Sequence, residues 1–201
     1  MIDLQTFFNN LTLLPTESME EFSKLFKPKV IKKGEYFIKE GQIAKEMAFL
    51  ESGIMRVFFR NDEGVEYNKQ FFVNPSLVGG YTSLITNQPS QINQQALTDC
   101  KLLVAKYADI QSLYDISPSF ERAGRIMAEY YFVQKEQREI ELVLLDAEKR
   151  YAIFKKEFPT LEQHIPQYHI ASYLGVTPTQ LSRIRKKLAT QQDLSTYVNG
   201  I

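Results

Sequence analysis

Hydrophobic and polar positions follow a helical period at the start of the chain. Leu4, Phe7, Phe8 and Leu11 would share one side of a helix, and Pro15 interrupts the pattern. Residues 3–25 are therefore expected to be helical, with a break at the proline.

The pattern changes to short apolar runs between about residues 27 and 106. These runs are rich in Val, Phe, Tyr and Ile, and turn residues such as Ser52-Gly53 and Asn74-Pro75 separate them. Short strands at this spacing predict an antiparallel sandwich or barrel, whereas an α/β fold would alternate strands with long helices. The predicted strands are residues 29–32, 36–38, 47–50, 55–60, 67–73 and 102–105.

A helical period returns after Ser117-Pro118 and persists to about residue 145. Ser117 suits the N-cap and Pro118 the first helical position. Apolar positions then alternate at spacings of three and four, which predicts a coiled-coil-like seam for dimerisation. The alternative is that this stripe packs against the chain's own β-domain. The seam positions are Ala123, Ile126, Tyr130, Val133, Gln137, Ile140 and Leu144.

Residues 169–188, HIASYLGVTPTQLSRIRKKL, predict a helix-turn-helix. In the first helix Ile170, Ala171 and Leu174 recur at helical spacing, and Gly175 supplies a turn that glycine enters without steric cost. Thr177 can act as the N-cap of the second helix, with Gln180 as the far side of a capping box. The alternative is an ordinary helical hairpin with a solvated basic face.

The second of these helices divides into two faces. Leu181, Ile184 and Leu188 form its apolar side, while hydroxyl, amide and cationic side chains occupy the other. A helix that reads DNA needs this division, because one face packs while the other donates hydrogen bonds to base edges and phosphates.

Composition places the chain among globular proteins without a membrane span. Hydrophobic residues make up 44% and charged residues 24% of the sequence, and no apolar run approaches the ~20 residues of a spanning helix. The N-terminus resembles no export signal, and Cys100 alone excludes intrachain disulfides and a cysteine-ligated iron–sulfur cluster. A cytoplasmic protein is expected.

Charge is distributed unevenly although the net charge is zero. Residues 146–201 hold eight Lys and Arg against five Asp and Glu, a local charge of +3, so the remainder carries −3. The positive charge thus lies where the predicted DNA-reading helix lies.

A β-rich segment, a long helix and a C-terminal helix-turn-helix together resemble the catabolite activator/fumarate-nitrate regulator (CRP/FNR) superfamily of transcription factors. The most specific anchors are residues 169–188 and the junction LLDAEKR at residues 144–150. The resemblance implies an α+β fold. Its expected parts are an N-terminal antiparallel β-roll sensor domain at residues 1–116, a dimerisation helix at 117–145 and a helix-turn-helix domain at 146–201 with a short or absent wing.

The resemblance also implies what the DNA-binding residues do. The family's base-contacting positions fall at Pro178, Thr179 and Arg183, and Pro178 cannot donate a hydrogen bond. Asp146 would cap the next helix at the interdomain hinge. The predicted DNA-binding residues are Thr177, Thr179, Gln180, Ser182, Arg183, Arg185, Lys186 and Lys187, the last three being better placed for phosphates.

The effector pocket departs from the cyclic-nucleotide-binding members of the family. Those members hold the ribose with a Glu and the cyclic phosphate with an Arg, where this chain has Gly80 and Ser90. Without the guanidinium a buried phosphate loses a partner worth about 1.5–3 kcal/mol. Cyclic AMP is therefore not the expected effector, and whether another metabolite binds stays open. The predicted pocket residues are Gly79, Gly80, Tyr81, Ser83, Ser90, Gln91, Lys135 and Glu136.

These residues favour one function over two alternatives. The favoured one is a homodimeric regulator that reads a pseudo-palindromic site in double-stranded DNA and acts with RNA polymerase, with no metal or resident cofactor. The second is a ligand-binding or protein-interaction module with a vestigial helix-turn-helix. A β-barrel metalloenzyme is disfavoured because residues 27–106 contain no histidine. His164 and His169 flank the helix-turn-helix and are expected to be cap or surface residues.

Overall fold

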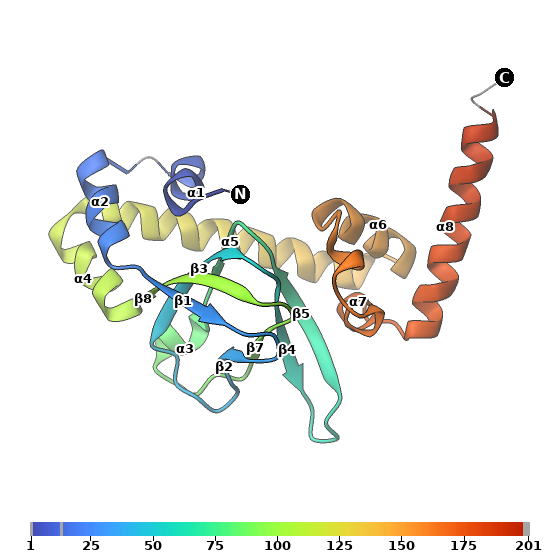
Figure 1. Cartoon of the computed structure of the whole chain (residues 1–201), viewed down its shortest axis with the longest axis horizontal. Helices are drawn as coiled ribbons and strands as arrows, with labels where there is room; N and C mark the ends of the chain where they lie inside the picture. The colour runs from blue at the N-terminus through green and yellow to red at the C-terminus, as the bar shows by residue number, and fades with distance from the viewer. Residues whose placement is uncertain (1, 13, 199–201) are drawn as a thin grey trace. The chain divides into compact units, whose positions relative to one another are not determined.

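The computed structural model of the chain describes residues 2–12 and 14–198, with side chains to Thr190 (Figure 1). It divides into two compact units, Met1–Gln134 and Lys135–Ile201. Helix α5 runs through the division. The helices are α1 Leu4–Leu11, α2 Thr16–Lys24, α3 Tyr81–Thr86, α4 Tyr107–Ile116, α5 Pro118–Leu144, α6 Ala147–Glu157, α7 Gln167–Leu174 and α8 Pro178–Val198, with a short 3₁₀ helix at Leu161–Gln163.

The first unit contains two antiparallel four-stranded sheets. One has the order β1-β8-β3-β6 and the other β2-β7-β4-β5. The strands are β1 Lys27–Ile31, β2 Tyr36–Ile38, β3 Glu46–Ser52, β4 Met55–Arg60, β5 Glu66–Phe72, β6 Ser76–Val78, β7 Asn93–Ala96 and β8 Cys100–Lys106. This arrangement confirms the predicted antiparallel β-roll.

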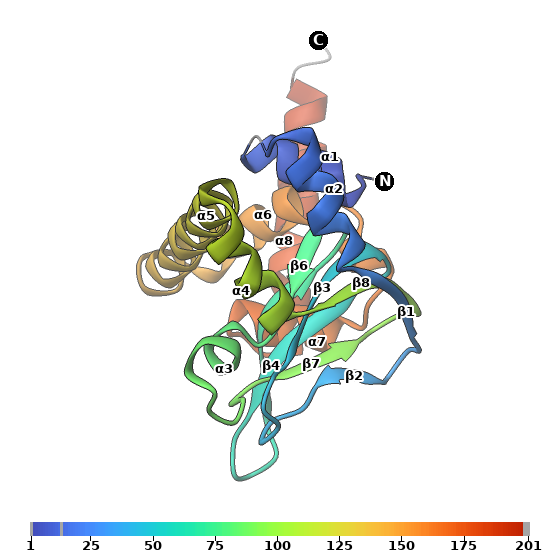
Figure 2. The ribbon, with the colours of Figure 1, turned by 90° about the vertical axis from the view of Figure 1, so that its left-hand side faces the viewer.

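Alternation along the strands builds a core between the two sheets. Leu50 and Leu102 project from the first sheet toward Met55 and Ala96 of the second, and all four are at most 1% exposed. Because strand side chains alternate in direction, Phe49 projects from the opposite face of the first sheet. That face is covered by α1, α2, α4 and the start of α5 (Figure 2).

Helix α5 begins within the first unit and packs against its other elements. Phe120 and Ala123 are buried in the same cluster as Phe49. Gly124 permits a close contact, because a Cβ there would lie 2.6 Å from the hydroxyl oxygen of Tyr114. The N-terminal turns of α5 therefore pack on the chain's own β-domain, which was the alternative interpretation of the apolar stripe on this helix. Further along the helix, Tyr130 and Val133 are exposed.

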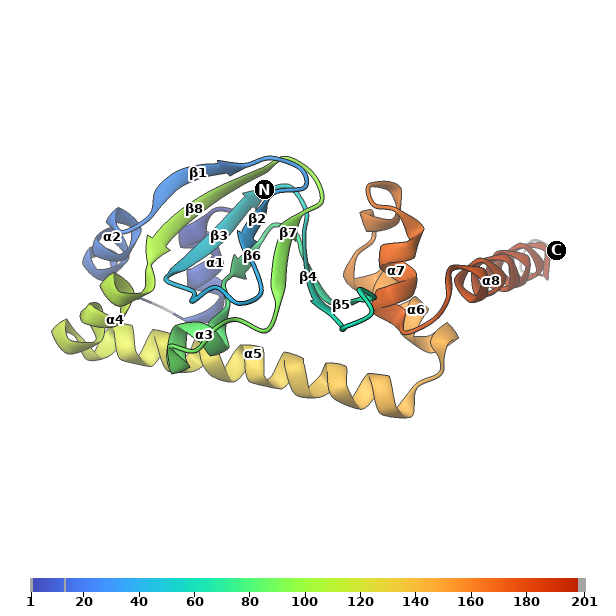
Figure 3. The same ribbon diagram turned by 90° about the horizontal axis from the view of Figure 1, so that it is seen from below.

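In the described residues of the second unit, the regular secondary structure is helical throughout. Phe154 of α6, Ile170 and Leu174 of α7, and Leu181 of α8 are each fully buried. Helices α7 and α8 are joined by a short turn (Figure 3). The residues between α6 and α7 contain only the 3₁₀ helix, so no β-wing occupies that connection, in line with the prediction of a short or absent wing.

Some elements differ from the sequence prediction. Strands β6 and β7 were missed because β6 has only three residues and β7, Asn93-Gln94-Gln95-Ala96, is polar despite its burial. Helix α4 was also missed. His169 was expected to be a cap or surface residue but lies inside α7 and is 4% exposed, because α7 turns that side toward the core. His164 is exposed, as expected.

Candidate nucleic-acid interface and effector cassette

The turn between α7 and α8 is built by glycine. Gly175 ends α7 with φ 68°, a left-handed conformation that residues with a Cβ rarely adopt. Its N–H donates to the carbonyl of Ser172 at 3.2 Å, and the N–H of Val176 donates to that of Ala171 at 3.0 Å. These bonds satisfy carbonyls at the end of α7 and direct the chain into α8.

Helix α8 begins with the predicted capping box. The backbone N–H of Thr177 donates to Oε1 of Gln180 at 2.9 Å, and the N–H of Gln180 donates to Oγ1 of Thr177 at 3.2 Å. Gln180, predicted to read bases, therefore uses its carbonyl oxygen within the protein.

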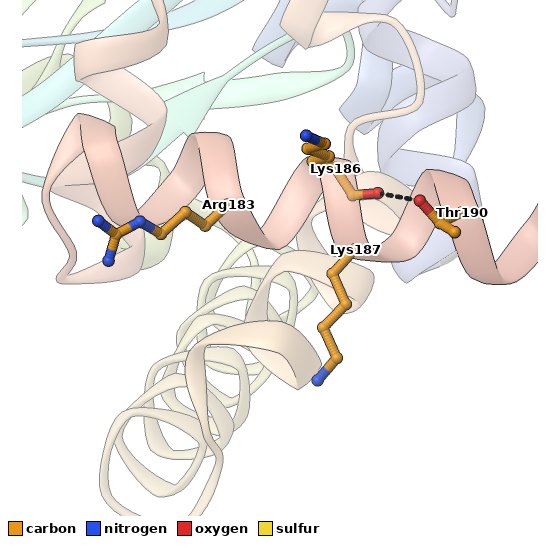
Figure 4. Close-up of a pocket in the computed structure, with 4 residues that line it drawn as sticks. All are labelled: Arg183, Lys186, Lys187 and Thr190. Carbon is orange, nitrogen blue, oxygen red and sulfur yellow. Dashed lines mark hydrogen bonds between the residues drawn. The ribbon is translucent and has the colours of Figure 1, made fainter.

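The remaining predicted reading residues form one exposed face of α8. Thr179, Arg183 and Lys186 lie opposite the buried Leu181, with Ser182 beside them. Within the part of the chain whose side chains are described, none of these four side chains has a hydrogen bond or ion pair. Arg183 and Lys186 also line a shallow surface pocket with Lys187 and Thr190 (Figure 4).

Two cations of α8 are already paired with carboxylates of the second unit. The Nζ of Lys187 lies 2.7 and 2.9 Å from the two carboxylate oxygens of Glu148 on α6, and the Lys187 side chain extends away from that of Lys186 (Figure 4). The Nε of Arg185 lies 3.5 Å from Glu162. Their predicted phosphate contacts would have to compete with these ion pairs.

Asp146 caps α6 as predicted. Its carboxylate accepts a hydrogen bond of 2.9 Å from the backbone N–H of Lys149, which lowers the pKa of the carboxyl group below its usual value. Its role as a hinge stays a prediction.

Two arginines that are not among the predicted site residues reach the end of α7. Arg138 on α5 donates to the carbonyl of Tyr173, and Arg150 on α6 donates to that of Leu174. Arg150 lies in the quoted junction motif, four residues after Asp146. The sequence does not indicate which carbonyls it would meet.

The predicted effector pocket, called the cassette below, is crowded at Gly80. A Cβ at this position would lie 3.1 Å from Cδ1 of Ile38 and 3.3 Å from Cβ of Ala44. The position of the family's ribose-binding Glu thus has little space for any side chain, because apolar groups of the roll already occupy its surroundings.

The serines of the cassette are engaged within the protein. Ser83 accepts from the N–H of Ala44 and donates to the carbonyl of Gln88, while Ser90 donates to the carbonyl of Ile92. Both are buried. Both hydroxyl groups therefore already have hydrogen-bond partners within the protein, and neither needs an anionic ligand to satisfy it.

The other predicted pocket residues are dispersed. Tyr81 and Gln91 are exposed, and the carbonyl of Gly79 accepts from the side-chain amide of Gln94 at 2.9 Å. Lys135 and Glu136 belong to the second unit, where both are exposed and Lys135 lies 3.4 Å from Glu139. The structure brings Gly80, Ser83 and Ser90 together in one unit, and the participation of Lys135 and Glu136 stays a prediction.

Among the residues that the structure describes, no cluster of three or more His, Cys, Asp and Glu side chains could hold a metal ion. No helix in the same residues is both long and apolar enough to cross a membrane.

Comparison with known proteins agrees with this architecture. Residues 28–117 match the family of cyclic nucleotide-binding domains. No curated protein matches the sequence. Among solved structures, FixK2 from Bradyrhizobium japonicum is similar over 83% of this chain and 86% of its own, with 18% identity and a TM-score of 0.73.

Two further regulators share the fold. The c-di-GMP-responsive global regulator CLP of Xanthomonas campestris is 17% identical over 89% of this chain and 93% of its own, with a TM-score of 0.68. A transcriptional regulator described as a Crp/Fnr family protein, from Eubacterium rectale, is 18% identical over 89% and 85%, with a TM-score of 0.67. At these identities the likeness establishes the fold. Residues 28–117 thus resemble the cyclic nucleotide-binding domain family, and the chain has the fold seen in these CRP/FNR-type regulators.

Proposed function

We propose that this chain, which has the CRP/FNR regulator fold, is a homodimeric, sequence-specific DNA-binding transcription regulator. The observation that carries the proposal is the exposed face of α8, where Thr179, Arg183 and Lys186 stand opposite the buried Leu181. A helix anchored by one face and bearing hydrogen-bond donors on the other has the form that enters the major groove.

The exposed side of α5 supports dimerisation through residues 117–145. Tyr130, Val133, Ile140 and Leu144 are between 41% and 73% exposed, although they recur on one helical face. A second copy of the chain could bury this apolar stripe. Two recognition helices about 34 Å apart would then read a pseudo-palindromic site. RNA polymerase would be the partner through which binding changes transcription.

The proposed regulator does not use cyclic AMP in the way of the nucleotide-binding members. The predicted pocket carries no carboxylate at Gly80 and no guanidinium at Ser90, a Cβ at Gly80 would lie close to Ile38 and Ala44, and the Ser90 hydroxyl donates to the carbonyl of Ile92. Any effector would have to be recognised by other contacts of the roll.

Selection of bound sequences from random DNA by the full chain tests this function. The pool is presented at low salt, with and without a cell metabolite extract, and calorimetry with cyclic AMP is run in parallel. The expected result is an enriched pseudo-palindrome and no heat of nucleotide binding. If no DNA sequence is enriched with or without the extract, the proposed regulator function is overturned.

A further inference from the structure

Arg150 contacts the C-terminal ends of two helices at once. Its Nη1 donates to the carbonyl of Leu145 at 2.6 Å and lies 3.4 Å from that of Leu142, at the end of α5. Its Nε donates to the carbonyl of Leu174, the last residue of α7, at 3.2 Å. One guanidinium thus joins α5 to α7 from its own position on α6.

These contacts are favourable because the last carbonyls of a helix have no partner within it. A cation near a helix C-terminus also meets the negative end of the helix dipole. Arg150 serves two such ends with one planar group whose donors have fixed directions, which a flexible Lys ammonium does not reproduce.

Arg138 makes a second, adjacent attachment. Its Nη2 donates to the carbonyl of Tyr173 at 2.7 Å, and its guanidinium carbon lies 4.0 Å from the centre of the Tyr173 ring. Glu141 pairs with the same guanidinium at 3.0 Å, and the Arg138 side chain is only 15% exposed. Consecutive carbonyls of α7 are therefore held by arginines from α5 and from α6.

The attached segment leads directly into the reading helix. Only residues 175–177 separate Leu174 from the first residue of α8. At the other end, Ile140 and Leu144 of the proposed dimer seam lie in the same turns of α5 as Arg138 and Leu142.

We propose that Arg138 and Arg150 are positioning residues that fix the recognition helix relative to the end of the dimerisation helix. The two arginines would thereby determine the spacing between half-sites that the dimer accepts. Bending at the Asp146 junction would break the contacts of Arg150 to Leu145 or Leu174, so they hold this junction in one geometry. This inference rests on the proposed function.

The test measures the preference of the intact dimer for half-site spacing. Two copies of the half-site selected by the wild-type chain are separated by a series of spacers, and each dissociation constant is measured by mobility shift. The wild type should prefer one spacing by about tenfold or more over its neighbours. Arg150→Met should reduce that preference to about threefold or less while leaving the base preference within each half-site unchanged.

Control variants separate positioning from charge and from folding. Lys156→Met removes one charge from the exposed surface of α6, and Lys156 has no ion pair among the described residues, so it should keep the wild-type spacing preference. Arg150→Lys should retain only part of the wild-type preference for half-site spacing. Sedimentation and thermal unfolding identify variants that no longer dimerise or fold.

Unchanged spacing preference in a folded, dimeric Arg150→Met protein would overturn the positioning role. If that variant does not fold, Arg138→Lys carries the same expectation of broadened spacing, and failure of both to fold would also overturn a positioning role. Absence of any selected half-site for the wild-type chain would instead count against the proposed function.

Discussion

The side chain of Gln180 returns to the residue that starts its own helix. Its Oε1 accepts the backbone N–H of Thr177 at 2.9 Å, while the hydroxyl oxygen of Thr177 accepts the N–H of Gln180 at 3.2 Å. Each side chain thus satisfies a backbone N–H group at the start of α8 that has no partner within the helix. Gln180 therefore contributes mainly to the stability of α8, and less to base reading than its exposed position indicates.

Replacement of Gln180 by Ala should therefore destabilise the protein. The loss of the capping box is expected to lower the free energy of unfolding by about 1 kcal/mol. Gln180→Glu preserves the box and is the matched control in chemical denaturation. The sequence selected by Gln180→Ala should equal that of the wild type, and a changed base preference at unaltered stability would contradict this assignment.

Arg183 and Lys186 should differ in what their loss does to DNA binding. Arg183→Ala is expected to relax the base preference at one position of each half-site, at a cost of about 1–3 kcal/mol. Lys186→Ala should weaken binding to all sequences and reduce the salt slope by about one. Mobility shifts over a series of salt concentrations measure both, and an Arg183→Ala protein with unchanged affinity and specificity would show that this residue does not read bases.

The ion pair between Glu148 and Lys187 should limit DNA affinity. Glu148→Gln frees the Lys187 ammonium, which is expected to bind a phosphate and to make the salt dependence of binding steeper by about one counterion. The control is the same substitution in a Lys187→Ala background, where no such gain is expected. An equal gain in both backgrounds would mean that Glu148 acts through general charge and not through Lys187.

Adjacent residues of α5 provide a matched test of the dimer seam. Val133→Asp places a charge on the proposed seam and should shift the protein to a monomer in sedimentation measurements, because burying an unpaired charge is costly. Phe132 is 65% exposed and points about 100° away around the helix. Phe132→Asp should leave the dimer intact. Dissociation by Phe132→Asp alone would place the interface on another face.

The cap at Asp146 should make stability depend on pH in one direction. The hydrogen bond from Lys149 holds the pKa of this carboxyl group below its ordinary value, so its stabilisation is complete above the unfolded pKa of about 3.9 and is lost as the pH falls through the folded pKa. Asp146→Ala should lower the melting temperature at pH 7, and the difference from wild type should narrow below about pH 4. A difference that grows on acidification would exclude this cause.

Several parts of the fold could be predicted because the interactions that form them are local. The turn at Gly175 and the caps at Thr177 and Asp146 each join residues within five positions of one another, so residue type and spacing suffice to identify them. Strand β7 could not be identified in this way. Its burial depends on distant strands, and its own residues are polar.

The tertiary structure decided which of the predicted site residues have partners. Lys187 and Glu148 are separated by 39 positions, and Arg150 and Leu174 by 24, so neither contact leaves a local pattern in the sequence. The space around Gly80 likewise depends on Ile38 and Ala44, which come from another part of the roll. The amino-acid sequence by itself determined where a recognition helix begins and which face it exposes, because helix capping and periodicity act over a few residues. Only the packing of separate helices and strands decided which cations remain available for DNA and how the reading helix is held.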